Sequence, residues 1–266
     1  MTYNIWNGFD NGNDTVRKES WIEWIKGKDP DVLALQELCG YNEKKLKADA
    51  VKWGHPYVKI LKSTGYPVGL TSKKPITLKE RSLKKLWHGM LHCETYGIDF
   101  FVVHLSPADC DYRFNEANII TEKVKESKSD KYIIIGDFNA HSPFDGELLK
   151  HNKSLRKKYT NKKPNKKYSN LRLGEIDYSV ISRFLSIPTI DICQIFMDIP
   201  DRYTFPTPAL IGVYQTAEEI RQNKERIDYI LTSPIISKSC TNVNIFNDED
   251  TGLLSDHYPV MAEFKF

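Results

Sequence analysis

Short apolar runs recur throughout this chain, separated by turn residues or by longer amphipathic stretches. Such runs are typical of buried strands, whereas apolar residues spaced three or four apart are typical of helices. The pattern predicts helices at residues 15–26, 42–52 and 113–126, the first capped by Asp14 or Thr15. It predicts strands at residues 1–5, 32–35, 68–71, 100–105, 132–136, 227–231 and 259–264. Because strands outnumber helices and several follow one another directly, we expect a mixed-sheet α/β (α+β) domain rather than a doubly wound parallel sheet.

The composition fits one globular domain over residues 1–266, with 40% hydrophobic and 27% charged residues. No apolar run approaches the roughly 18 residues of a spanning helix, so we expect no transmembrane segment. The five cysteines form no CxxC pair, which favours free thiols over a zinc site. No targeting segment is visible before the first strand, so the cytoplasm and export after removal of a signal peptide both stay open. We expect a monomer.

One segment carries charge of a single sign. Residues 148–172 hold ten basic and no acidic side chains. The whole chain has a net charge of +3, from 38 basic and 35 acidic residues, and without this segment the balance is 28 − 35 = −7. Pro164 and four asparagines predict an exposed loop inserted in the domain. Such a loop either keeps the protein soluble or attracts an anionic substrate.

Acidic, amide and histidine side chains stand at the ends of several apolar runs, where a sheet of an α/β protein opens onto its ligand. Carboxylate and amide oxygens suit Mg²⁺ or Mn²⁺, which proteins bind through few carboxylates together with water and substrate phosphate. Histidines beside carboxylates can move protons during attack of water on phosphorus. One such residue could simply cap a turn, but five sites in one chain favour phosphoester chemistry. The residues are Glu37, His104, Asp137 with Asn139, Asp228, and Asp256 with His257.

Six motifs resemble those of the endonuclease/exonuclease/phosphatase superfamily in their residues and in their order along the chain. This superfamily includes deoxyribonuclease I, abasic-site endonucleases, neutral sphingomyelinases and inositol-polyphosphate 5-phosphatases. The resemblance extends from Tyr3 to about Phe264 and implies a four-layer sandwich of two packed mixed β-sheets flanked by helices. The motifs are Tyr3-Asn4-Ile5, Leu35-Gln36-Glu37, Val103-His104-Leu105, Gly136-Asp137-Phe138-Asn139, Arg226-Ile227-Asp228-Tyr229 and Ser255-Asp256-His257.

The resemblance implies a divalent-metal site. Glu37 would be the principal ligand of Mg²⁺ or Mn²⁺, and Asn4 and Asp256 would complete or support its shell. Trp6-Asn7 departs from the superfamily pattern, because abasic-site endonucleases carry an acidic residue there.

The resemblance also implies catalytic and substrate-binding roles. His257 would be the general base or, alternatively, the histidine that binds phosphate, and Asp228 would orient it. Asp137 would position the attacking water or protonate the leaving oxygen, and Asn139 would donate a hydrogen bond to a phosphate oxygen. His104 would act in catalysis or substrate binding at a position that is tyrosine in abasic-site endonucleases, which places this chain away from that branch.

Several residues carry weaker signals. Arg113 and Glu116 are expected to form an ion pair that supports the preceding loop, although Arg113 is also a candidate phosphate ligand. Tyr66 and Lys74 are candidates to face substrate, and His141 is a candidate for the pocket rim. The aromatic residues within 203–206 are expected either to stack on a ring or to pack in the core. The histidines that match no motif, expected to be surface or structural residues, are His55, His88, His92 and His151.

These observations predict a divalent-metal-dependent phosphoesterase. Its substrate is a phosphoester, either a small molecule or a nucleic acid, so phosphodiesterase, phosphatase and DNA or RNA nuclease all stay open. A pseudoenzyme that only binds phosphate would be expected to lack Glu37, Asp137 or His257, and all three are present. A binding module acting through the basic segment would not need the ordered motifs.

Overall fold

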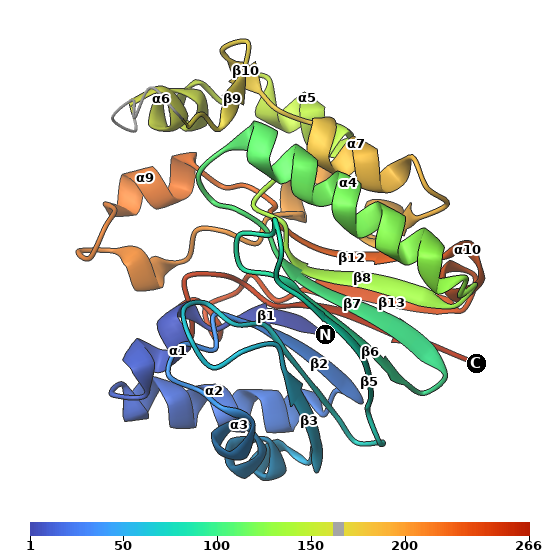
Figure 1. The fold of residues 1–266 in the computed structure, drawn as a ribbon. Coiled ribbons are helices and arrows are strands. Elements are labelled where there is room, and N and C mark those ends of the chain that lie inside the picture. Colours follow the sequence, from blue (N-terminus) through green and yellow to red (C-terminus); the bar gives the residue numbers. More distant parts are fainter. Residues whose placement is uncertain (162–167) are drawn as a thin grey trace.

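The computed structural model describes residues 1–161 and 168–266, in which two six-stranded mixed sheets pack face to face (Figure 1). The first sheet has the order β13-β14-β1-β2-β4-β3, and the second has the order β11-β12-β8-β7-β6-β5. The strands of the first sheet are β1 (Thr2–Asn4), β2 (Val32–Gln36), β3 (Tyr57–Ile60), β4 (Gly69–Ser72), β13 (Cys240–Ile245) and β14 (Val260–Phe264). Those of the second are β5 (Thr77–Ser82), β6 (Met90–Thr95), β7 (Ile98–His104), β8 (Tyr132–Asp137), β11 (Ile190–Asp191) and β12 (Asp228–Thr232). A separate ribbon pairs β9 (Leu171–Arg172) with β10 (Glu175–Ile176).

Helices cover the outer faces of both sheets, which confirms the predicted four-layer sandwich (Figure 1). The first sheet is covered by α2 (Thr15–Lys28) and α3 (Glu43–Ala50), and the second by α4 (Cys110–Ser127) and α7 (Ser179–Leu185). The shorter helices are α1 (Trp6–Asn11), α5 (Gly146–Leu149), α6 (Lys153–Asn161), α8 (Ile192–Phe196), α9 (Ala217–Gln222) and α10 (Pro234–Ser237). The 3₁₀ turns are Val51–Trp53, Pro143–Asp145, Ile199–Asp201 and Pro208–Leu210. Within the described residues, no helix has the length and apolar character needed to cross a membrane.

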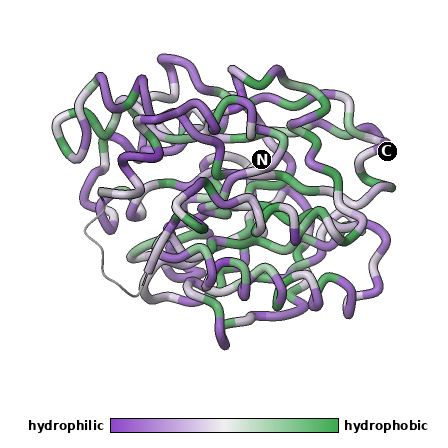
Figure 2. The backbone as a smooth tube through the Cα atoms, turned by 90° about the horizontal axis from the view of Figure 1, so that it is seen from above, coloured by the Kyte–Doolittle hydropathy of each residue, from purple (hydrophilic) through white to green (hydrophobic). Residues whose placement is uncertain are grey.

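The central strands are buried on both faces, which explains why their apolar runs are continuous rather than alternating. Along β8, Ile133 and Ile135 face the core between the sheets, whereas Ile134 packs under α4 and α7. On β2, Ala34 faces the core between the sheets and Leu33 faces α2 and α3. In Figure 2 the hydrophobic stretches run mainly through the interior and the hydrophilic ones mark the periphery.

Strand register brings polar residues from both sheets to one edge of the sandwich. β1 and β2 run parallel, with Asn4 opposite the last residue of β2, so Asn4 and Glu37 leave the first sheet side by side. β7 and β8 also run parallel, and His104 pairs with Asp137. β12 runs antiparallel to β8, and its first residue, Asp228, pairs with Asp137 as well. The segment before β14 reaches the same edge, because β14 runs antiparallel to β1.

The basic segment is not the loop that its charge predicted, because residues 153–161 form α6 and residues 171–172 form β9. Leu155 is fully buried and packs with Leu149 and Ile176, and the Asn152 side chain caps α6 by accepting the N–H of Leu155. These apolar contacts stabilise a helix that was not predicted, because lysines dominate its sequence. Among the described residues of the segment, four basic side chains form ion pairs with acidic ones: Lys150, Arg156, Lys158 and Arg172. The remaining part of the prediction, around Lys162, Lys163, Pro164, Lys166 and Lys167, lies outside the described residues.

The segment after β1, labelled α1, is a left-handed turn rather than a right-handed helix. From Trp6 to Asn11 the backbone φ lies between +49° and +58°. Most residues lose roughly 1–2 kcal/mol each in this conformation, whereas Asn, Asp and Gly tolerate it best. The Asn-Gly-Phe-Asp-Asn composition of the segment fits that preference. Gly8 lies so close to the turn after β2 that an added Cβ would sit 2.1 Å from the Cys39 carbonyl oxygen.

Candidate active site

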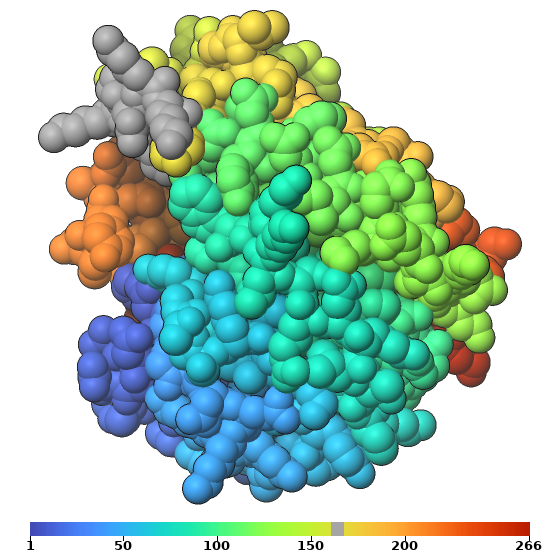
Figure 3. Space-filling model, in the orientation of Figure 1, coloured from blue at the N-terminus to red at the C-terminus, as the bar shows by residue number. Residues whose placement is uncertain are grey.

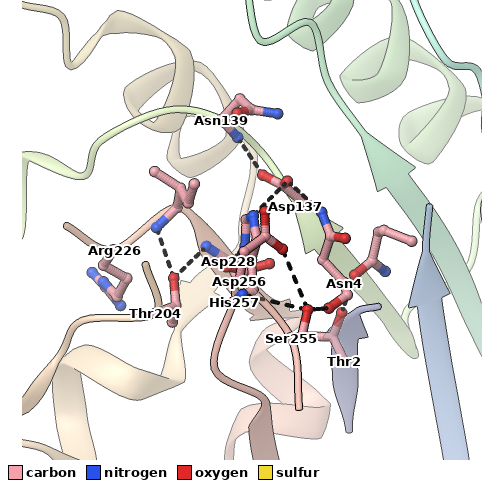
Figure 4. Close-up of polar contacts among 12 residues, drawn as sticks. Thr2, Asn4, Asp137, Asn139, Thr204, Arg226, Asp228, Ser255, Asp256 and His257 are labelled. Atoms are coloured by element: carbon pink, nitrogen blue, oxygen red, sulfur yellow. Dashed lines mark hydrogen bonds and ion pairs between the residues drawn. The ribbon is translucent and has the colours of Figure 1, made fainter. Parts of the chain in front are cut away.

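His257 and Asp228 form a hydrogen-bonded pair where the two sheets meet (Figure 4). The Nδ1 atom of His257 lies 2.8 Å from Oδ2 of Asp228, and its Nε2 atom lies 3.8 Å from Oδ2 of Asp137. Thr204 supports the start of β12, because its Oγ1 accepts the N–H groups of Ile227 and Asp228 at 3.1 and 3.2 Å. The imidazole is therefore held between two buried carboxylates.

These carboxylates determine the charge of the imidazole. Burial opposes a charged His257, but Asp228, Asp256 and Asp137 outweigh it and raise the pKa of His257 well above its ordinary value. Burial and the negative charge of Asp228 raise the pKa of Asp137, although His257 and two amide hydrogen bonds oppose that shift. The group can therefore hold a proton near neutral pH and exchange it with a reacting oxygen.

Asn4 and Glu37 bring the first sheet to this group. The Nδ2 atom of Asn4 donates to Asp137 Oδ2 at 3.1 Å and to Glu37 Oε1 at 3.5 Å. The second carboxylate oxygen of Glu37 accepts the N–H of Asn7, in α1, at 2.7 Å. Ser255 donates its hydroxyl to the Asn4 carbonyl at 2.6 Å, which ties β1 to the segment before β14 (Figure 4). Asn4 thus supports the two carboxylates through its amide group.

Three carboxylates, those of Glu37, Asp137 and Asp256, line one hollow of about 330 Å³. No Lys or Arg of the described chain is among its lining residues. Burial, together with the negative charge of Glu37, raises the pKa of Asp256 to about 6, although His257 opposes the shift. A hard divalent cation would offset this accumulation of negative charge, and carboxylate oxygens are its preferred ligands. The residues present fit such an ion, which Glu37 and Asp256 would hold.

A second group of possible ligand atoms belongs to Asp137, Asp228 and His257, whose ligand atoms all lie within 4.8 Å of one another. Metal ions bind the neutral form of imidazole. Because His257 favours its charged form and already bonds to Asp228, this trio suits proton handling better than metal binding.

His104 and Asn139 both lie against Asp137. The Nε2 atom of His104 is 3.5 Å from Asp137 Oδ2, and the backbone N–H of Asn139 donates to Asp137 Oδ1 at 2.8 Å. Burial and the neighbouring His88 and His257 lower the pKa of His104 well below its ordinary value, so its imidazole is neutral. The side-chain amide of Asn139 donates to the Leu105 carbonyl at 3.1 Å.

Two hollows meet at the candidate catalytic groups. A second hollow, of about 290 Å³, shares Pro107, Asn139, Asp256 and His257 with the first. Its walls include Phe205, whose ring centroid lies 4.9 Å from that of His257. In Figure 3, the blue segment with α1 and the orange segment with α9 lie along the left edge of the molecule, one below and one above this end of the sandwich. His257 and Asn139 thus have space on both sides.

Glu225 anchors α6 beside the second hollow. Its buried carboxylate accepts hydrogen bonds from Lys158 at 3.0 Å, from Tyr159 at 2.5 Å and from His141 at 2.8 Å. Burial alone would raise the pKa of Glu225, but Lys158 and the hydrogen bonds from His141 and Tyr159 lower it well below its ordinary value. His141 therefore lies behind the rim, bonded to Glu225.

Some sequence-based predictions for this region need correction. Arg113 does not line either hollow, because its buried guanidinium donates to the Ser106 carbonyl and to Asn170 Oδ1, both at 2.8 Å. Glu116 is not its ion-pair partner: it accepts the N–H groups of Trp87 at 2.7 Å and Ser106 at 2.8 Å. Both residues fix the loop after β7 through its backbone. Lys74 lies over the Tyr96 ring, and it lines neither hollow.

His88 and Trp87 line the first hollow, although neither belongs to a motif. His88 was expected to be a surface or structural residue, yet it stacks on His104 with ring centroids 4.2 Å apart. Tyr66, a weak candidate in the sequence, lines the same hollow. Besides Tyr66, the sequence signal for this side of the hollow was the adjacent aromatic pair Trp87 and His88, which Gly89 separates from β6.

Comparison with known proteins agrees with the fold and the motifs. The model of the Endonuclease/Exonuclease/phosphatase family matches residues 1–257, so the chain belongs to this family. It is accordingly a hydrolase that acts on phosphoester bonds. No curated protein sequence matches the chain.

Solved structures share the fold at low sequence identity. An AP endonuclease from Archaeoglobus fulgidus is 19% identical with a TM-score of 0.75, and the match covers 100% of this chain and 98% of that one. A 3′-5′ exonuclease from Neisseria meningitidis is 21% identical with a TM-score of 0.68 and the same coverage. A 3′ phosphatase from Neisseria, bound to a product DNA hairpin, is 20% identical with a TM-score of 0.67 and again the same coverage.

Proposed function

We propose that this protein is a divalent-metal-dependent phosphodiesterase. The observation that carries the proposal is that His257, which is hydrogen-bonded to Asp228, lines the same carboxylate-rich hollow as Glu37 and Asp256. The predicted alternative of Mg²⁺ or Mn²⁺ stays open, since both prefer oxygen ligands. When bound, the cation would offset negative charge on the phosphoryl group and polarise it toward attack.

The chain's own residues supply the proton transfers and the phosphate contacts. The charged imidazole of His257 is placed to bind a phosphoryl oxygen through Nε2, while Asp228 holds Nδ1. Asp137, kept in place by Asn4 and the backbone of Asn139, accepts a proton from the attacking water or donates one to the leaving oxygen. The remaining N–H of the Asn139 amide is available to a phosphoryl oxygen, because within residues 1–161 and 168–266 that amide donates to the Leu105 carbonyl alone.

A diester suits the site better than a monoester. A monoester carries one organic group, whereas two hollows flank His257 and Asn139. A nuclease is the second candidate. It is favoured by the structural neighbours described as an AP endonuclease and a 3′-5′ exonuclease, which at this identity share the fold. Tyrosine at the His104 position, expected of the abasic-site branch, is missing here.

Hydrolysis of bis-p-nitrophenyl phosphate and p-nitrophenyl phosphate tests the proposal. With Mg²⁺ or Mn²⁺, we expect faster turnover of the diester, and none after chelation. Glu37→Gln and His257→Ala should each lower kcat/KM by about two to four orders of magnitude. His92→Ala is a matched control, since His92 also bonds to a carboxylate, that of Asp99 at 2.6 Å, but lies outside both hollows. Full activity in chelator, or near-normal activity of Glu37→Gln, would contradict the assignment.

A further inference from the structure

Besides His104 and His257, four further aromatic rings from three parts of the chain line the first hollow: Trp6, Tyr66, Trp87 and His88, which we call the aromatic wall. Trp87 and Tyr66 keep 38% and 42% of their surface exposed. Exposed aromatic side chains gathered beside catalytic groups are typical of a binding surface, because their burial against a ligand removes apolar area from water.

The protein holds these rings from behind. The ring of Trp87 meets that of Tyr112 edge-on at 5.4 Å, and its backbone N–H is fixed by Glu116. The guanidinium of Arg17 lies 5.1 Å from the Trp6 ring centroid and donates to the carbonyls of Ile5 and Trp6. Such support lowers the conformational entropy that a side chain loses on binding.

The middle of the aromatic wall is continuous with the catalytic residues. Tyr66 packs edge-on against His88 at 5.3 Å, and His88 stacks on His104. Burial, together with the positive charge of Lys62, lowers the pKa of His88 to about 4, so its ring is uncharged. The uncharged rings of Tyr66, His88 and His104 therefore form a row from the rim of the hollow to Asp137, which His104 contacts.

The residues that line the hollow discriminate between ligand classes. Apart from Pro107, the described lining holds no aliphatic side chain that would receive an acyl chain. It also has no Lys or Arg to bind the additional phosphates of a polyphosphorylated headgroup. Aromatic rings beside carboxylates and amides instead suit a flat ring with polar edges.

We propose that the aromatic wall binds a nucleobase attached to the reacting phosphate, so that the substrate is a nucleotide ester. This inference rests on the proposed phosphodiesterase function and adds the substrate class. Aromatic side chains can stack on a base of any identity, because every base has a π face. The wall is accordingly a subsite for one unstacked base of any identity.

Equilibrium binding of AMP and ribose 5-phosphate in Mg²⁺ buffer isolates the base, since both ligands carry the same phosphate and sugar. We expect the wild-type protein to bind AMP at least about tenfold more tightly. Trp87→Ala and Tyr66→Ala should reduce this preference to less than about threefold, whereas Trp87→Phe should keep most of it. Tyr96→Ala is the matched control: Tyr96 is 38% exposed, like Trp87, but lies beside Asp31 outside the hollow.

Kinetics with one leaving group provide a second readout. We expect Trp87→Ala to lower kcat/KM about tenfold more for the p-nitrophenyl ester of thymidine 5′-phosphate than for methyl p-nitrophenyl phosphate. Equal affinity for AMP and ribose 5-phosphate in the wild type, or a preference that survives both alanine substitutions, overturns the base subsite. An equal decrease in kcat/KM for both esters also overturns the base subsite. If neither ester is hydrolysed, the phosphodiesterase proposal fails, while the binding comparison still decides the subsite.

Discussion

The charge of His257 depends on carboxylates from three different segments: the end of β8, the start of β12 and the loop before β14. Burial alone would leave this imidazole neutral, but Asp137, Asp228 and Asp256 surround it. The nearest of them, Asp228, fixes Nδ1 and leaves Nε2 directed toward Asp137. The family resemblance left open whether this histidine acts as a base or binds phosphate. A charged ring surrounded by carboxylates favours phosphate binding.

Asp228→Asn tests that choice through pH. The substitution removes the largest favourable charge on His257, so the pKa of His257 should fall, which NMR titration of its ring protons would measure. If the charged ring binds phosphate, loss of activity at high pH should begin at a lower pH in the variant. We also expect kcat/KM to drop by about two to four orders of magnitude. If only the acidic limb of the pH–activity profile shifts, His257 is instead the general base.

Sequence analysis could place residues at strand ends, but it could not predict what surrounds them. Glu37, Asp137 and Asp228 follow or begin apolar runs, and parallel or antiparallel register necessarily brings such residues to one edge. His88 and Thr204 act at the same site through packing and backbone hydrogen bonds across long sequence separations. Neither residue type nor spacing signals those contacts.

At the level of elements, α1 connects backbone strain to the candidate metal site. Its left-handed residues present the Asn7 N–H to Glu37, which itself has a φ of +59°. A left-handed segment and a single left-handed residue therefore meet where a metal ligand is expected. Conformations of this kind persist only when surrounding packing enforces them, and they concentrate at functional sites.

Gly8→Ala should disrupt this arrangement. The new Cβ would lie 2.1 Å from the Cys39 carbonyl oxygen, and the backbone φ of +58° disfavours alanine. We expect the free energy of unfolding to fall by at least about 2 kcal/mol, measured by urea denaturation. Gly27→Ala is the matched control in α2, where nothing lies within 4 Å of the added Cβ; it should gain about 0.5–1 kcal/mol. A Gly8→Ala protein as stable as the wild type would refute the close packing.

Elements with continuous apolar runs could be predicted from sequence, and those with mixed patterns could not. The expected strands at 32–35 and 132–136 correspond to β2 and β8, which are buried on both faces. β5 and β13 were not predicted, because both are edge strands in which exposed polar residues alternate with more buried ones. The basic segment was assigned to a loop because lysines outnumber the few anchors, such as Leu155, that make α6 a helix.

For the whole molecule, the site joins the two sheets. Asn4 and Glu37 come from the first sheet, Asp137 and Asp228 from the second, and the Asn4–Asp137 hydrogen bond crosses between them. The carboxylates gathered there repel one another, and burial increases the cost of their charge. A cation bound at this junction would therefore stabilise the packing of the whole sandwich as well as serve the chemistry.

Thermal unfolding measures that coupling. A ligand at one hundred times its Kd stabilises the native state by about 2.7 kcal/mol, which for a chain of this size raises Tm by about 5–10 °C. We expect Mg²⁺ or Mn²⁺ to raise the wild-type Tm by this amount and Glu37→Gln to abolish the effect. In chelator, Glu37→Gln removes a negative charge that raises the pKa of Asp256, but it also removes one of the two oxygens that accept from Asn4 and Asn7, so the test compares the metal-induced shift in Tm and not the Tm in chelator. Glu23→Gln, at a side chain 70% exposed in α2, should keep the full metal response. Equal metal-induced shifts in wild type and Glu37→Gln would exclude Glu37 as a ligand.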